Sequence, residues 1–368
     1  MKKIIVFIST CFMLQLPGMA QLSTTPNGGN KKAMVGERIG LTDVTIHYNR
    51  PALKGRAGKI WGELVPFGFT DLGFGTSKAA PWRAGANQNT SIEFSTDVMI
   101  NDQPLPAGKY GFFIATGKEE STLIFSKDNA AWGSYFYDPA RDALRISSRQ
   151  QVLDKPVEVL EFVFQDQTAN AASISLQWEN WKFPFTVATD LNSIQASSFR
   201  NELKSAKGFE WQAWVQAASW SADNNTNLAE GLQWADYAIA GPFVGEKNFT
   251  TLSAKAKILN KMGKGAEATA LMQEATAMGS VAEVHNYARS LLAAGKATEA
   301  AAVYKANYKK YPNVFTSNMG MVRALSSEGK YKDALKYANT ALAQAPDEAN
   351  KKNLAAMIEK LKKGENVN

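Results

Sequence analysis

The stretch LLAAGKATEAAAV, residues Leu291–Val303, decides the fold of the C-terminal half because the chain contains two further copies of it. They are LNKMGKGAEATAL at Leu259–Leu271 and LSSEGKYKDALKY at Leu325–Tyr337. Apolar residues in all three copies recur at spacings of three and four, which is the period of an amphipathic helix. Each copy has a glycine followed by lysine, and these glycines, 32 and 34 residues apart, are Gly263, Gly295 and Gly329. The pattern predicts pairs of helices with glycine at the turn.

Small and helix-ending residues complete each unit. Four residues after each glycine stands an acidic residue and then an alanine, which lets two helices approach closely. Pro312 and Pro346 end the second helices of their units. A degenerate fourth copy, LAEGLQWADYAIA, precedes them at Leu228–Ala240. The segment resembles the tetratricopeptide repeat, a helix-turn-helix unit of about 34 residues that must stack on its neighbours to bury its apolar face. The alternative is an irregular helical bundle.

The preceding part of the chain, from Met34 to about Val187, has a period of two instead. Apolar residues alternate with polar ones in KYGFFIAT (109–116), STLIFSK (121–127) and SISLQWEN (173–180). Many short strands without intervening helices predict an antiparallel β-sandwich or an open barrel. In VEVLEFVFQ (157–165) the apolar face switches, which predicts a β-bulge.

The first twenty residues have the pattern of a secretory signal peptide. Lys2 and Lys3 precede the apolar stretch Ile4–Leu16, and small residues lead to Ala20. We expect export to the periplasm or beyond, and a mature chain without cysteine, because Cys11 lies in the apolar stretch. A buried amphipathic start of the fold is the alternative. No other run is long enough to span a bilayer.

These patterns define a multidomain β + α protein, with a β-sandwich or open barrel followed by an α-solenoid. The predicted boundaries are a signal peptide at 1–20, an N-terminal extension at 21–33, the β domain at 34–187, a linker at 188–207, helical repeats at 208–362 and a tail at 363–368. Within the linker, NSIQASSFRNEL (192–203) has helical character of its own.

Composition narrows the class of protein further. Apolar residues make up 45% and charged residues 20% of the chain, which is typical of a globular protein. The net charge of +7 falls to +5 when Lys2 and Lys3 are removed with the signal peptide. No dense basic helix accompanies this charge, so we expect no nucleic-acid partner.

The β half also resembles a bacterial family of exported proteins, the domain of unknown function numbered 2911. The resemblance rests on four segments: VTIHYNRPALKGR (44–56), IWGELVPFG (60–68), PWRAGANQNTSIEF and its continuation (81–114), and SISLQWENWKFPFTV (173–187). It implies a β fold and export, but no activity. FTDLGFGTSKAAP (69–81) lies where many members have almost nothing, so we interpret it as a loop insertion of about ten residues.

Residues suited to catalysis or metal binding are sparse. The two histidines fall in different halves. We expect His47 to face solvent or to pack as a neutral ring, and His285 to lie on the surface of a repeat helix. The carboxylates of the β half have no spacing that defines a pair, and no G-x-S-x-G motif is present. We therefore predict no catalytic residue, no metal site and no cofactor, and favour a non-enzyme.

Two loop-like segments of the β half hold the remaining candidates, which are Arg50, Lys54, Arg56, Trp82, Arg83, Asn87 and Asn89. Arginine offers a planar fork for carboxylate or phosphate, and tryptophan offers a flat face for a sugar, so one reading is a pocket for an anionic or saccharide ligand. In the other, favoured reading the arginines bind carbonyls and carboxylates that pin long loops, and Trp82 and Trp61 plug the core.

The functional hypothesis is an exported binding protein of the bacterial envelope. Its repeats are expected to bind a protein or peptide, since stacked helix pairs create an extended surface. The alternative is an envelope hydrolase or a carbohydrate-binding protein that acts through the β domain.

Overall fold

The computed structural model describes residues 29–368, which form two compact units, one ending at Asp190 and one running from Leu191 to Asn368. The predicted signal peptide and most of the predicted N-terminal extension lie outside the described residues. Among the described helices, none combines the length and the hydropathy needed to cross a membrane.

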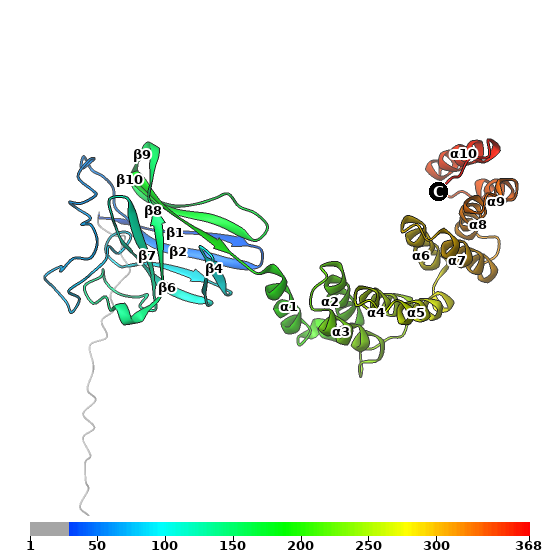
Figure 1. Cartoon of the computed structure of the whole chain (residues 1–368), viewed down its shortest axis with the longest axis horizontal. Coiled ribbons are helices and arrows are strands. Elements are labelled where there is room, and N and C mark those ends of the chain that lie inside the picture. The colour runs from blue at the N-terminus through cyan, green and yellow to red at the C-terminus, as the bar shows by residue number, and fades with distance from the viewer. Residues whose placement is uncertain (1–28) are drawn as a thin grey trace, which may run out of the picture. The chain divides into compact units, whose positions relative to one another are not determined.

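The first unit consists of two antiparallel sheets (Figure 1). The six-stranded sheet has the order β1-β2-β3-β6-β7-β8, and the four-stranded sheet has the order β5-β4-β10-β9. The strands are β1 (Lys31–Ile39), β2 (Thr42–Arg50), β3 (Thr90–Phe94), β4 (Val98–Ile100), β5 (Gln103–Leu105), β6 (Gly108–Ala115), β7 (Glu120–Ser126), β8 (Asp142–Arg149), β9 (Gln151–Gln165) and β10 (Ala171–Ala188), with a short 3-10 helix at Pro139–Arg141. Of the two predicted architectures, the β-sandwich is confirmed.

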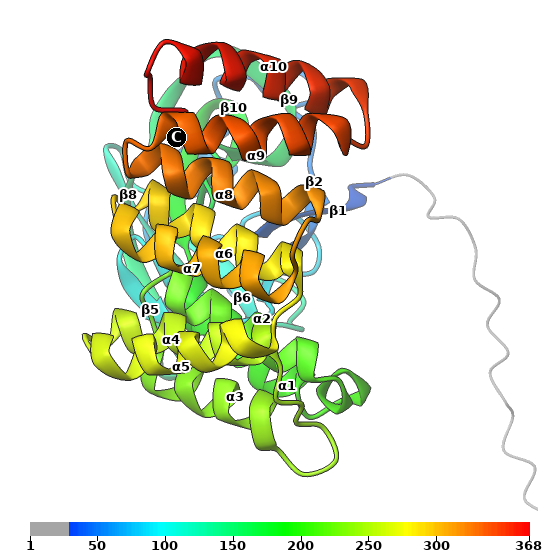
Figure 2. The same cartoon turned by 90° about the vertical axis from the view of Figure 1, so that its right-hand side faces the viewer.

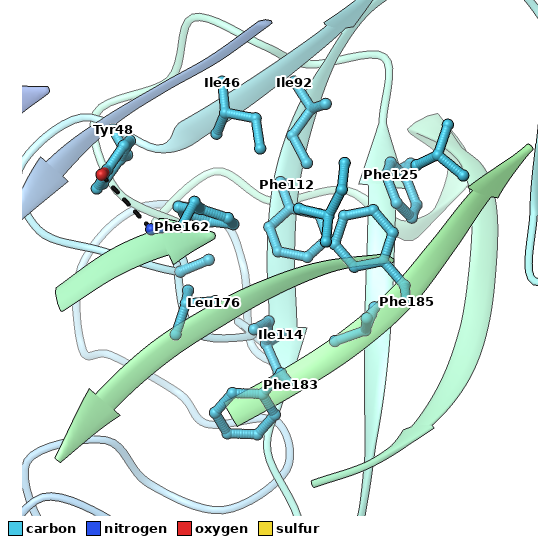
Figure 3. Close-up of a cluster of buried hydrophobic side chains, with 14 of the residues drawn as sticks. Ile46, Tyr48, Ile92, Phe112, Ile114, Phe125, Phe162, Leu176, Phe183 and Phe185 are labelled. Atoms are coloured by element: carbon cyan, nitrogen blue, oxygen red, sulfur yellow. Dashed lines mark hydrogen bonds between the residues drawn. The ribbon is translucent and has the colours of Figure 1, made fainter. Parts of the chain in front are cut away.

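The core of this unit lies between the two sheets, as Figure 3 shows. Alternate residues of each strand point inward, so that Ile46 of β2 is buried whereas His47 beside it is exposed. Ile92 and Phe112 of one sheet face Phe185 of the other, and the rings of Phe112 and Phe185 are 5.6 Å apart. Each such side chain contributes about 1.5–3 kcal/mol by its burial, so the alternating pattern fixes which face of each strand lies inside.

The predicted bulge is confirmed in the long hairpin of β9 and β10. The register moves from Gln177 opposite Glu161 to Glu179 opposite Val157, so β9 has extra residues between these pairs. Glu179 adopts a left-handed conformation, with φ of 54°, at the irregularity. The bulge explains why the apolar face of β9 switches within one strand.

The second unit is a run of helices, of which α2 to α9 form four successive pairs followed by α10 (Figure 2). The helices are α1 (Leu191–Glu202), α2 (Trp211–Asp223), α3 (Leu228–Ala240), α4 (Phe249–Lys261), α5 (Gly265–Met278), α6 (Val281–Ala293), α7 (Ala297–Lys310), α8 (Phe315–Ser327), α9 (Tyr331–Ala343) and α10 (Glu348–Lys362), with a 3-10 helix at Ala206–Phe209. The predicted second helices thus appear as α3, α5, α7 and α9.

The three repeated sequences form the same turn. Gly263, Gly295 and Gly329 have φ of 78°, 76° and 72°, which is the left-handed region that glycine adopts without strain. In each case the lysine after the glycine donates its backbone N–H to a leucine carbonyl five residues earlier, at 2.8 Å for Lys264–Leu259 and 2.9 Å for both Lys296–Leu291 and Lys330–Leu325. The alanines of the pattern are almost fully buried between helices: Ala268, Ala300 and Ala334.

Two segments that the sequence placed outside the repeats pack against the helices. The linker at 188–207 contains helix α1, whose Phe199 packs edge-on against Trp220 and Trp234 at 5.5 and 6.1 Å. It is therefore part of the helical unit, because its apolar side chains cover the end of the first pair. The tail at 363–368 folds back onto α8, where the backbone N–H of Val367 donates to the Ser326 hydroxyl at 3.0 Å.

The turn conformation predicts that alanine substitution lowers the unfolding free energy at one exposed glycine and not at another. A Gly295→Ala variant should lose about 1–2 kcal/mol of unfolding free energy, since no atom crowds the new methyl group and the left-handed backbone alone is strained. Gly265→Ala is the control, because Gly265 begins α5 without a positive φ and also has open space around it. Urea unfolding followed by far-UV circular dichroism measures both. Equal stability of the two variants would contradict the role of the turn.

Candidate functional site

Arg50 joins the two sheets at the point where the chain leaves β2. After Pro51 the chain runs beside β9, and the backbone N–H of Leu160 donates to the Pro51 carbonyl at 3.0 Å. The Arg50 guanidinium donates to the Leu160 carbonyl at 2.7 Å and pairs with Glu161 at 3.2 Å. This side chain therefore fixes the crossing from one sheet to the other.

The rest of the first basic loop is held in the same way. Arg56 donates to the carbonyls of Leu53 and Ala52 at 2.9 and 2.8 Å. The backbone N–H of Lys54 donates to the Glu158 carboxylate at 3.0 Å, while the Lys54 side chain is exposed. Of the three basic residues, only Lys54 thus has a charged group without a hydrogen-bond or ion-pair partner among the described residues, because both arginines bind the backbone.

The second predicted segment is packed against the core. Trp82 donates its indole N–H to the Gly85 carbonyl at 3.1 Å and stacks on Trp178 with ring centroids 6.1 Å apart. Arg83 donates to the Asn87 carbonyl at 2.9 Å and lies 5.2 Å from the centre of the Tyr135 ring. Trp61 lies 5.7 Å from Trp82, so the two rings fill the same part of the core.

These contacts agree with the structural reading of the basic loops. Six of the seven predicted residues lie in the two loop segments just described. The seventh, Asn89, has another environment, because it lines a polar cavity on the outer face of the six-stranded sheet. The insertion at 69–81 packs on a neighbouring loop, where Ser77 donates its backbone N–H to the Tyr135 carbonyl at 3.0 Å.

Arg50→Ala should lower the unfolding free energy of the β unit by about 1.5–3 kcal/mol, the usual contribution of hydrogen bonds from a charged donor. Lys54→Ala is the matched control from the same loop and should change it by less than about 0.5 kcal/mol, because its side chain is exposed. Guanidinium unfolding followed by tryptophan fluorescence measures the effect. A neutral Arg50→Ala variant would show that the crossing does not need this side chain.

Within the helical unit, the helix pairs do not stack equally closely. Helix α4 packs along both α2 and α3, and α8 packs along α7 and α6. Helix α6 approaches α4 and α5 much less closely. The connection there is only two residues long, Gly279 and Ser280, whereas four residues, 311–314, join α7 to α8.

This looser packing leaves a cleft between the second and third helix pairs. A cavity of about 470 Å³ lies between α5 and α7, and one of about 670 Å³ lies between α4 and α6. The two cavities share part of their lining, which is Thr269, Met272, Tyr287, Leu291 and Glu299. Because they share these residues, we treat the two cavities as two mouths of one opening, which we call the inter-pair cleft.

The walls of the inter-pair cleft are mainly apolar. Met272 of α5 faces a wall of α7 that contains Val303 and the exposed alanines Ala302 and Ala306. Charged residues of both signs, such as Lys257 and Glu283, occur at the α4–α6 mouth. The arrangement can bury apolar side chains of another molecule without a strong charge preference.

One end of the cleft is closed by hydrogen bonds from the end of α7. Lys310 donates to the carbonyls of Ala277 and Gly279 at 2.7 and 3.0 Å, and Tyr311 donates its hydroxyl to Gly279 at 3.0 Å. Asn307 donates its amide to the Val281 carbonyl at 2.9 Å. The pairs are thus tied together at one end and open along the rest. The sequence did not reveal this cleft, because the repeated motif alone predicts uniform stacking.

His285, for which the sequence suggested a surface position, is largely enclosed between α6, α7 and α8. Its ring lies 5.2 Å from that of Tyr304, and Arg289 and Arg323 are the charged groups that act on it. Burial and the positive charges of Arg323 and Arg289 together lower the pKa of His285 to about 4. Three buried atoms here have no hydrogen-bond partner among the described residues: His285 Nδ1, the Tyr304 hydroxyl and Arg323 Nε.

This environment makes the helical unit sensitive to acid. The unfolded chain binds a proton at His285 near its ordinary pKa of 6.5, but the folded chain does so only near 4. The contribution of the neutral His285 ring to the unfolding free energy is therefore fully present above about pH 6.5. It falls as the pH drops from 6.5 to 4 and does not change further below pH 4. The total loss is about 3 kcal/mol.

His285→Gln should remove this contribution, so the difference in unfolding free energy between wild type and variant should change across that pH window. Urea unfolding at several pH values, followed by far-UV circular dichroism, measures it. His47→Gln is the control, because that histidine is exposed in the other unit. A pH-independent difference for His285→Gln would contradict the buried neutral ring.

Comparison with known families gives a match for each unit. Residues 30–187 match the family model described as "Protein of unknown function (DUF2911)", and residues 291–358 match a tetratricopeptide repeat model. No curated protein matches the chain.

Several solved structures resemble the helical unit. One is YrrB, described as a TPR protein with an unusual peptide-binding site; it is 16% identical, with 46% of this chain and 86% of that one covered and a TM-score of 0.29. A tetratricopeptide repeat protein from Parabacteroides merdae is 13% identical, with coverages of 47% and 70% and a TM-score of 0.31. MamA from Desulfovibrio magneticus is 13% identical, with coverages of 46% and 94% and a TM-score of 0.26.

Proposed function

We propose that this chain, a DUF2911 domain followed by tetratricopeptide repeats, is an exported scaffold that binds another protein in the inter-pair cleft. Stacked helical repeats are commonly used to bind peptides and proteins along their surface. The observation that carries the proposal is the cleft itself, an opening between the second and third pairs that is lined mainly by apolar side chains.

The occupant that fits the cleft is a peptide segment with apolar side chains. Met272, Leu291 and Val303 offer aliphatic surface on different helices, so one inserted side chain contacts several of them. Burial of such side chains supplies about 25 cal/mol per Å² of apolar area. The backbone of the segment can reach the polar groups at the mouths, among them Thr269 and Glu299.

Export is supported by the first twenty residues. Their lysines, apolar stretch and small residues before Gln21 have the order that signal peptidases recognise in secreted proteins. The scaffold would then act in the cell envelope or outside the cell. No activity is assigned to the β domain in this proposal.

Selection of twelve-residue peptides from a displayed library against the full chain tests the cleft. Peptides with apolar side chains should be enriched, and Ala306→Glu should weaken their binding at least tenfold. The new carboxylate would stand on the apolar wall of α7 and would lose its hydration when the peptide binds.

Ala355→Glu is the matched control, since Ala355 is also an exposed alanine within a helix of the same unit, α10, and does not line the cleft. It should leave peptide affinity unchanged. The proposal fails if no peptide is enriched, or if Ala306→Glu binds the selected peptides as well as the wild type does.

A further inference from the structure

The polar cavity that contains Asn89 is a second site, on the β domain. It has a volume of about 320 Å³, and its floor is the outer face of the six-stranded sheet. Residues of β1, β2, β3 and β6 line it together with the segments at 88–89 and 129–130. At about 30 Å³ for each water, this volume holds roughly ten water molecules, so a small organic molecule fits inside.

Three side chains of the cavity are buried yet keep hydrogen-bonding atoms unused. Asn49, Asn89 and Ser91 are 4%, 6% and 5% exposed. Asn89 donates its amide to the Asp128 carbonyl at 3.2 Å, but its Oδ1 is buried without a partner. Among the described residues, neither the Asn49 amide nor the Ser91 hydroxyl forms a hydrogen bond with the protein. Buried polar groups normally find partners, so these groups favour a polar ligand.

The rim of the cavity is basic. Lys32, His47 and Lys109 line it, and none of their side chains has an ion-pair partner in the described part of the chain. Within residues 29–368, no aspartate or glutamate lines the cavity. Of two carboxylates close by, Asp128 pairs with Arg141 at 3.0 Å. Glu93 lies opposite Lys109 on the same face of the sheet, where it is exposed and forms no ion pair with the described residues.

The outer wall of the cavity is held at a fixed distance from the sheet. The segment at 128–129 crosses over β6 at Gly111, where a Cβ atom would lie 2.1 Å from the Asp128 carbonyl oxygen. Asn129 donates its side-chain amide to the Lys109 carbonyl at 2.9 Å. Glycine at this position therefore allows the close approach, and the hydrogen bond keeps the wall in place.

The geometry points to a binding site for a small oxyanion that carries hydroxyl groups. Lys32, His47 and Lys109 supply donors for the anionic group, which charge-assisted hydrogen bonds hold most strongly. The hydroxyl groups donate to Asn89 Oδ1 and exchange hydrogen bonds with Asn49 and Ser91. This site is independent of the inter-pair cleft and of its function.

Isothermal titration calorimetry of the full chain with three related compounds tests the site. Glycerol 3-phosphate and D-glycerate carry the same kind of hydroxyl groups with a phosphate or a carboxylate, and glycerol carries no charge. At constant ionic strength at least one anion should bind and glycerol should not. The preferred anion tells whether the natural ligand is a phosphate ester or a hydroxy acid.

Substitutions test whether the anion binds in this cavity. Lys109→Ala and Asn49→Ala should each weaken the preferred anion at least tenfold, whereas Lys155→Ala, which removes an exposed lysine of β9 outside the cavity, should not. Lys109 is exposed, so its loss leaves the fold intact even if Asn49→Ala disturbs it. The inference is overturned if neither anion binds, if glycerol binds equally well, or if Lys109→Ala and Lys155→Ala have the same effect.

Discussion

A helix pair cannot bury its apolar stripe alone, and this constraint governs the C-terminal half of the protein. Each pair must be covered by its neighbours, so α1 covers the first pair and α10 covers the last. Helix α8 packs along both α6 and α7, so the third and fourth pairs stack closely. Where the second and third pairs stand apart, apolar side chains such as Met272 and Leu291 line an opening. The inter-pair cleft is thus a place where neighbouring helix pairs do not cover each other completely.

The β half is organised by a different rule, in which alternate residues of each strand face a common core. Its long loops bury apolar side chains such as Trp61 and Trp82 against this core, and arginines fix their backbone. Arg50, Arg56 and Arg83 each donate to backbone carbonyls, which are obligatory acceptors that a loop cannot satisfy by itself. Arginine suits this task because its planar fork presents several donors in a fixed geometry. The basic character of these loops is therefore largely a consequence of how they are folded.

The sequence predicted those features that depend on neighbours along the chain. The turns at Gly263, Gly295 and Gly329 and the alternation at Ile46 and His47 follow from local patterns, and so does the bulge in β9. Features that depend on distant partners were not predictable in the same way. Asn89 belongs with Lys32 and Lys109 because the strand order places them on one face, while Trp82 and Arg83 of the same predicted segment pack elsewhere. Likewise, the burial of His285 depends on Tyr304 and Arg323, which belong to two other helices.

The tie at the end of α7 has a mechanical consequence. Lys310, Asn307 and Tyr311 donate hydrogen bonds to carbonyls at and near Gly279, so a rotation about that corner would widen or narrow the gap beside them. A rotation of a few degrees about that corner displaces the far ends of the adjoining helices more than the ends near the corner. The size of a segment bound in the inter-pair cleft would therefore set the angle between the second and third helix pairs. A change in that angle would displace the repeats on either side over a longer distance.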